Sequence, residues 1–192
     1  MSGSVIAAII GGLVCLVVVI LVIWALAAYN KLVRQRNQVE ASWAQIDVQL
    51  KRRVDLIPNL VETVKGYAAH ERGTLEAVIQ ARNSAIAVSG QVPAGRAVAD
   101  NMVTQTLGRL FALAEAYPNL KANENFAALQ SELTGTEDKI SYARQFYNSA
   151  VQTFNTTIQS IPTNIIAGFG GFKEKEYFEA TEGERGPVQV RF

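Results

Sequence analysis

The hydrophobic pattern begins with an uncharged run from Val5 to Ala28 that is dense in Val, Ile and Leu. As a helix this run spans roughly 36 Å, and a bilayer's hydrocarbon core is about 30 Å thick. Trp24 and Tyr29 stand at its C-terminal edge, where aromatic rings favour the headgroup region. The run therefore predicts a transmembrane helix, whose lipid-facing residues we expect to include Val5, Ile9, Leu13, Leu16, Ile20 and Trp24.

Basic residues follow this run directly. Lys31, Arg34 and Arg36 precede the first acid, Glu40, whereas residues 1–4 carry no Lys or Arg. The positive-inside bias predicts a single-pass protein with its N-terminus outside and the rest of the chain in the cytoplasm.

The run could also be a cleaved signal peptide or a buried core helix. Ala25-Leu26-Ala27 has the small-x-small spacing of a signal-peptidase site, but no basic residue precedes the run, and it is longer than the usual h-region of about 7–15 residues. A buried core helix would rarely need so many consecutive uncharged residues. An uncleaved anchor is the favoured interpretation.

Beyond the anchor the pattern changes to heptads. From Tyr29 to Tyr67 apolar residues recur at alternating steps of three and four, interrupted by Arg36 and Arg53, which predicts one helix continuous with the anchor and bent at Pro58. Each arginine either extends its charge out of the seam or pairs with carboxylates that fix helix register. The expected bundle or oligomer seam contains Trp43, Ile46, Leu50, Arg53, Ile57 and Leu60.

Three further helices are predicted, over residues 74–88, 94–116 and 124–161, with Thr74 and Asn123 as N-caps. The last would be roughly 57 Å long. Only another long helix can cover its apolar stripe, and the first one, lying antiparallel, is the obvious candidate, with the two shorter helices on the remaining sides. The seam residues expected on this last helix are Ile140, Tyr147, Phe154 and Ile158.

The predicted fold class is all-α: a single N-terminal transmembrane helix, then an antiparallel, four-helix-bundle-like set of long helices, and a short irregular tail. The corresponding regions are 1–28, 29–163 and 164–192. Glycines and phenylalanines in the tail indicate a helix stop rather than a phosphate cradle, because no GK[ST] follows. The pattern leaves open whether the tail packs on its own bundle or on a neighbour.

Composition narrows the function classes. With 18 basic and 17 acidic residues, the net charge of +1 offers no field to collect nucleic acid. Cys15 is the single cysteine, and His70 is the single histidine, with Thr74 where HExxH needs its second histidine. We therefore expect no enzyme, no metal site and no cofactor.

Two stretches resemble a known family. Residues 29–71 read YNKLVRQRNQVEASWAQIDVQLKRRVDLIPNLVETVKGYAAHE, and residues 141–180 read SYARQFYNSAVQTFNTTIQSIPTNIIAGFGGFKEKEYFEA. Both are similar to the LemA family of bacterial membrane proteins, and the DLIPNLV run is the most distinctive part. The resemblance implies a cytoplasmic helical bundle on one anchor in the bacterial inner membrane, and a family without established enzymatic activity. Some members are tied to membrane shaping in magnetosome-forming bacteria.

Two function classes follow. The first is a scaffold that contacts membrane lipid and self-associates into a homo-oligomer, so that many anchors organise or curve the bilayer. The second is an adaptor that holds an unidentified signalling or proteolytic protein against the bundle.

Overall fold

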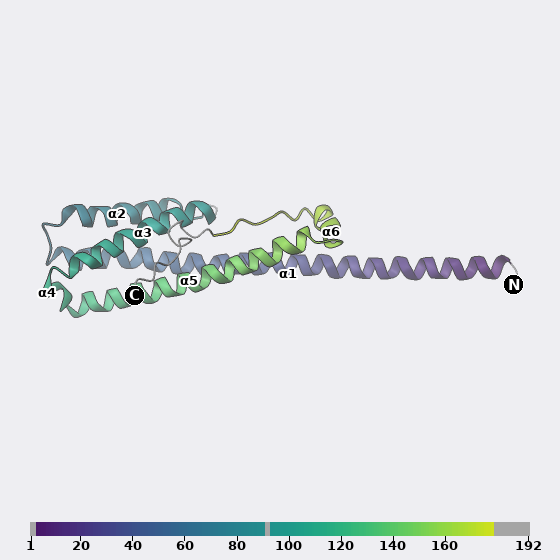
Figure 1. Ribbon diagram of the computed structural model, residues 1–192, viewed down its shortest axis with the longest axis horizontal. Coiled ribbons are helices and arrows are strands. Elements are labelled where there is room, and N and C mark those ends of the chain that lie inside the picture. The colour runs from purple at the N-terminus through teal and green to yellow at the C-terminus, as the bar shows by residue number, and fades with distance from the viewer. Residues whose placement is uncertain (1–2, 91–92, 179–192) are drawn as a thin grey trace, which may run out of the picture. The chain divides into compact units, whose positions relative to one another are not determined.

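The computed structural model describes residues 3–90 and 93–178, and every regular element in these residues is a helix. The described residues form six helices, which are labelled in Figure 1. Their bounds are α1 Gly3–Lys65, α2 Arg72–Ala87, α3 Pro93–Ala114, α4 Pro118–Lys121, α5 Glu124–Gln159 and α6 Thr163–Phe169. The predicted fold class, an apolar N-terminal helix followed by a helical bundle, is confirmed. The last part of the predicted irregular tail, residues 179–192, lies outside the described residues.

The helix boundaries agree with one prediction and correct another. Pro58 lies inside α1, as expected for one helix that runs on from the anchor, and the helix continues to Lys65. The second helix begins at Arg72 rather than at Thr74, because the Glu71 carbonyl already accepts the Leu75 N–H at 3.2 Å. Thr74 is therefore not the N-cap.

Two short helices were not predicted. Pro118 begins α4, since proline fits the first turn of a helix, where its missing N–H costs nothing. Within the segment expected to be an irregular tail, α6 forms one regular stretch. The predicted cap at Asn123 is confirmed, because its Oδ1 accepts the Phe126 N–H at 3.0 Å.

The packing divides the chain into two compact units, each containing part of α1 and part of α5. Within the described residues, unit 1 consists of residues 3–40 and 150–175, and unit 2 of residues 41–90, 93–149 and 176–178.

Unit 2 holds the main hydrophobic core. In it Trp43 contacts Tyr147 and Arg52 pairs with Glu132, so that later residues of α1 meet earlier residues of α5 and the two helices are antiparallel. Helices α2 and α3 pack on each other and close the core. Its buried side chains include Ile57, Leu60, Val64, Leu75, Val78, Val103, Leu107, Leu110, Leu120, Phe126 and Leu133.

Unit 1 has a smaller core, again between antiparallel stretches of α1 and α5. Gln35 Nε2 donates to Thr157 Oγ1 at 3.1 Å. The rings of Tyr29 and Phe154 both pack edge-to-face on Phe172, which follows α6. Its buried side chains are Leu32, Val39, Val151, Phe154, Asn155, Ile158 and Ala167.

Two asparagines of α5 hold the segment that follows α6. In unit 1, Asn155 Nδ2 donates to the Lys175 carbonyl and its Oδ1 accepts the Lys175 N–H, both at 2.9 Å. In unit 2, Asn148 makes the same pair with Phe178, at 3.0 and 2.9 Å. Each side-chain amide supplies the donor and acceptor that a neighbouring strand would give an extended backbone. As far as Phe178, the tail packs on its own chain.

Candidate functional site

The N-terminal half of α1 is exposed on every face. From Ile9 to Leu26 each large apolar side chain is exposed within this chain, and the most apolar window is entirely unburied. This rules out the core-helix interpretation. The described residues contain one helix long and apolar enough to cross a membrane. Of the expected lipid-facing residues, Ile9, Leu13, Leu16, Ile20 and Trp24 are exposed, and the side chain of Val5 lies outside the described set.

The juxtamembrane basic residues lie in the next turns of α1. Lys31, Arg34 and Arg36 are all exposed. The Arg36 guanidinium lies over the ring of Phe172, 5.5 Å from its centroid, and so stays at the surface of unit 1. Of the two interpretations given above for a seam arginine, Arg36 follows the one in which the charge extends out of the seam.

The predicted seam is buried inside the chain itself. Trp43 is half-buried, and the other seam residues have almost no exposed surface; these are Ile46, Leu50, Arg53, Ile57, Leu60, Ile140, Tyr147, Phe154 and Ile158. The seam therefore holds the bundle together and is not available to a second copy in this conformation.

A buried ion cluster lies where α1, α3 and α5 meet in unit 2. Arg53 pairs with the Asp100 and Glu137 carboxylates, and Arg144 pairs with Asp100 from the other side. Arg53 also donates to Thr104 Oγ1 and to the Asp100 carbonyl, both at 2.9 Å. The side chains of Arg53 and Asp100 are only 3 and 2% exposed, so their charges can be accommodated only as partners.

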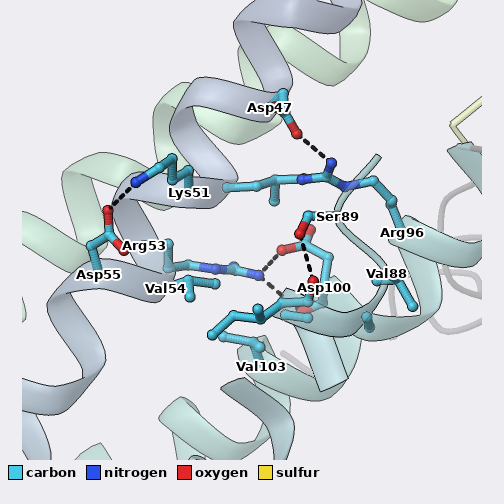
Figure 2. A pocket seen from close by; sticks show the side chains of 14 residues that line it. Asp47, Lys51, Arg53, Val54, Asp55, Val88, Ser89, Arg96, Asp100 and Val103 are labelled. Atoms are coloured by element: carbon cyan, nitrogen blue, oxygen red, sulfur yellow. Dashed lines mark hydrogen bonds and ion pairs between the residues drawn. The ribbon is translucent and has the colours of Figure 1, made fainter. Parts of the chain in front are cut away.

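A second ion pair crosses the same helices in the opposite sense. As Figure 2 shows, Arg53 extends from α1 toward Asp100, whereas Arg96 extends from α3 back to Asp47 on α1. The Arg96 guanidinium also lies over Trp43, 5.8 Å from the ring centroid. These reciprocal pairs fix the register of α3 on α1.

Aromatic rings continue this layer to the tail. Trp43 packs on Phe178 with centroids 5.9 Å apart, and the Arg144 guanidinium lies 4.8 Å from the Phe178 centroid. Tyr147 donates its hydroxyl to the Glu176 carbonyl at 2.8 Å. Burial, with a smaller effect of the Glu176 charge, raises the pKa of Tyr147 to about 12.

A cavity of about 340 Å³ opens beside the ion cluster. Its walls come from α1, from α2 with the residues after it, and from α3, and they include Leu50, Val54, Ile86, Val88 and Val103. Figure 2 shows Asp47, Lys51, Asp55 and Arg96 around it. An apolar interior with charged side chains at its edge can accept one apolar side chain of a partner.

An exposed apolar groove lies on the outer face of α1 and α5 in unit 2. Its large apolar members Val48, Tyr142 and Phe146 are 61, 74 and 49% exposed. Gln45, Gln49 and Lys139 complete the lining with Ala44 and Ala143. Adjacent exposed apolar side chains on a folded bundle make this groove a candidate contact surface.

The structure also locates the residues that the sequence offered for metal or redox chemistry. His70 and Cys15 are both exposed, and among the described residues no three His, Cys, Asp or Glu side chains are placed to hold a metal ion. Tyr117 donates to the Glu71 carboxylate at 3.0 Å, and this hydrogen bond raises the pKa of the tyrosine.

The sequence identified Arg53 as a polar seam residue but did not identify its partners Asp100 and Glu137, nor Arg144, which pairs with Asp100. The pair of Arg96 with Asp47 was not predicted either. A usable signal exists for Asp100, since Ala97, Ala99 and Val103 around it are apolar or small. An acid within such a stretch favours a buried pair.

The chain resembles known proteins along most of its length. The model of the LemA family matches residues 42–192. Magnetosome protein MamQ 2 of Paramagnetospirillum magneticum is 27% identical, over 85% of this chain and 69% of the relative. Magnetosome protein MamQ of Magnetospirillum gryphiswaldense is 25% identical over the same shares. Protein LemA of Metamycoplasma hominis is 28% identical, over 84% of this chain and 73% of the relative.

Proposed function

The chain belongs to the LemA family, and on that premise we propose that it is a non-enzymatic, membrane-anchored scaffold that self-associates and thereby organises or shapes the membrane. The apolar run of α1 serves as the anchor. Relatives named as magnetosome proteins support a membrane-organising role. No nucleic acid or cofactor takes part.

The observation that carries this proposal is the exposed groove of Val48, Tyr142 and Phe146. The chain's own seam is already buried, whereas this groove is an apolar surface of unit 2 that stays open to another molecule. A second copy presents the same groove, and two identical patches can pair about a twofold axis. Anchors confined to one membrane raise the local concentration of copies, so even a small patch can sustain association.

The basic residues support the orientation. Lys31, Arg34 and Arg36 are exposed immediately after the anchor, which favours their retention in the cytoplasm. We place the protein in the bacterial cytoplasmic membrane with its N-terminus outside and the bundle in the cytoplasm.

The test uses the full-length protein in mild detergent at micromolar concentration. Light scattering after size exclusion should give a protein mass of at least two chains. Glutamates at Tyr142 and Phe146 should reduce that mass to one chain. The matched control is Val98→Glu on α3, a residue 65% exposed outside the groove, which should leave the mass unchanged. A wild-type protein that is strictly monomeric overturns the proposal.

The alternative is an adaptor, and the cavity beside Arg53 favours it. A photo-crosslinker placed at Ile86, which lines the cavity, would report a heterologous partner. The same crosslinker at Tyr142 would report a second copy. Self-association predicts a ladder of homo-oligomers from position 142, whereas the adaptor predicts a single heterologous product from position 86.

A further inference from the structure

The surface of unit 1 carries an apolar tip at α6. Ile161, Ile165 and Phe169 are 83, 56 and 90% exposed. Ile165 and Phe169 are four residues apart and share one face of α6, and Ile161 immediately precedes the Pro162 cap. On the other side of the helix, Ala167 is buried.

The glycines after α6 hold this arrangement in place. Gly171 has a φ of +68° and donates to the Gly168 carbonyl at 3.3 Å, while Phe172 donates to the Ala167 carbonyl at 3.0 Å. These two hydrogen bonds form a Schellman motif. A Cβ at Gly170 would lie 2.6 Å from the Phe172 ring, so glycine is needed for the ring to fold back. Phe172 therefore packs inward while Phe169 points outward.

The tip lies at the end of the apolar run. Phe172 packs on Tyr29, the residue that directly follows the uncharged run, with ring centroids 5.5 Å apart. Figure 1 shows α6 beside α1 in this unit, with the exposed apolar turns of α1 continuing beyond it. With the run in a bilayer, Tyr29 lies near the headgroups. The exposed side chains of α6 are then at the same depth.

The charges near the tip fit a lipid surface. Residues 160–172 contain no charged side chain. Among residues 1–40 and 150–175, five side chains are basic and two are acidic, a net charge of +3. Anionic headgroups attract such a positive surface, and an uncharged tip can enter the boundary between headgroups and acyl chains without burying a charge.

We propose that α6 is a second membrane contact, in which Ile161, Ile165 and Phe169 insert into the surface of the bilayer that holds the anchor. The inference rests on the proposed function in one respect, because it takes the apolar run of α1 to span the membrane. The contact fixes unit 1 at two points on the membrane surface, which prevents it from rotating freely about its anchor.

The experiment measures depth in the full-length protein, reconstituted in vesicles of phosphatidylcholine and phosphatidylglycerol. Cys15 is replaced by serine, and one nitroxide label is attached at a cysteine replacing Ile165 or Phe169. Ile20→Cys is the anchor reference, and Val98→Cys is the exposed apolar reference. The collision rate of each label with oxygen is compared with that for a water-soluble nickel complex.

Labels at positions 165 and 169 should favour oxygen, as the label at 20 does, and report a depth within about 5–10 Å of the headgroup boundary. The label at 98 should favour nickel. If 165 and 169 resemble 98 while 20 stays in lipid, the second contact is overturned and the anchor stands. If 20 is also aqueous, the anchor itself fails. Labels at 165 and 169 that are shielded from both oxygen and nickel, with spectral broadening at 169 that disappears on dilution with unlabelled protein, would show that a second copy covers the tip, which also overturns the inference.

Discussion

The Arg53 cluster gives the sharpest prediction about stability. Replacing Arg53 with Met keeps most of the side-chain volume but removes the cation between Asp100 and Glu137. Asp100 is 2% exposed and would keep only Arg144 as a charged partner. Removing one partner of a buried pair costs about 3–5 kcal/mol, so we expect the free energy of unfolding to fall by about 3 kcal/mol, the lower end of this range.

Trp43 provides the assay. It contacts Arg96, Tyr147 and Phe178, so its fluorescence reports the folded state of unit 2. Urea unfolding is followed in detergent with Trp24 replaced by Phe, which leaves Trp43 as the single tryptophan.

Lys51→Met is the matched control on the same helix. Its pair with Asp55 is mostly exposed, and such pairs contribute about 0–1 kcal/mol. Adding Asp100→Asn to Arg53→Met should recover part of the loss, because it removes one of the two carboxylates that Arg53 had neutralised. We expect a coupling energy of about 1–3 kcal/mol between the two substitutions. A loss below about 1 kcal/mol for Arg53→Met, indistinguishable from the control, would refute the reasoning.

Three further predictions concern the tail and its supports. Asn148→Ala leaves the Phe178 backbone unpaired and should speed hydrogen exchange at that amide by roughly tenfold or more, for a loss of about 1–3 kcal/mol; unchanged exchange would contradict it. Tyr147 has a raised pKa, so the unfolded chain loses this proton first and stability should fall between pH 10 and about 12; if Tyr147→Phe shows the same fall, another group is responsible. Gly170→Ala should displace the Phe172 ring and lower the unfolding free energy by about 1–3 kcal/mol; a wild-type value would mean that the ring moves freely.

Much of the fold could be predicted from apolar periodicity. The seam residues from Ile46 to Leu60 are spaced at three and four along one helix, and the structure buries every one of them. Asn123 was identifiable as a cap because an acid, Glu124, follows it at the positive end of the helix. Such signals are local, so they can be read without knowing the fold.

The features that the sequence did not predict depend on contacts between residues far apart in the chain. Thr74 is a residue type that often caps helices, but the Leu75 N–H donates to the Glu71 carbonyl, so the helix begins earlier. The Glu71 side chain accepts a hydrogen bond from Tyr117, 46 residues away. The ion cluster likewise joins α1, α3 and α5. Neither interaction produces a periodic pattern in the sequence, because each depends on which helices pack against one another.

The orientation of the two phenylalanines at the end of α6 could be predicted only in part. Phe169 and Phe172 are the same residue type, three positions apart, and each follows a glycine, yet one points out and the other packs inward. The left-handed conformation at Gly171 decides between them. A glycine in the sequence permits that conformation but does not require it.

The burial of the seam inside one chain has a consequence for biosynthesis, because the seam residues of α1 are made before the helix that covers them. In unit 2, Ile46, Leu50 and Ile57 are covered in part by α5, which ends at Gln159. At about 5–20 residues per second, the ribosome needs roughly 5–20 s to pass from the end of α1 to the end of α5. Throughout that interval a nascent chain presents an uncovered apolar stripe. Such a stripe can bind chaperones or neighbouring nascent chains before its own partner has been made.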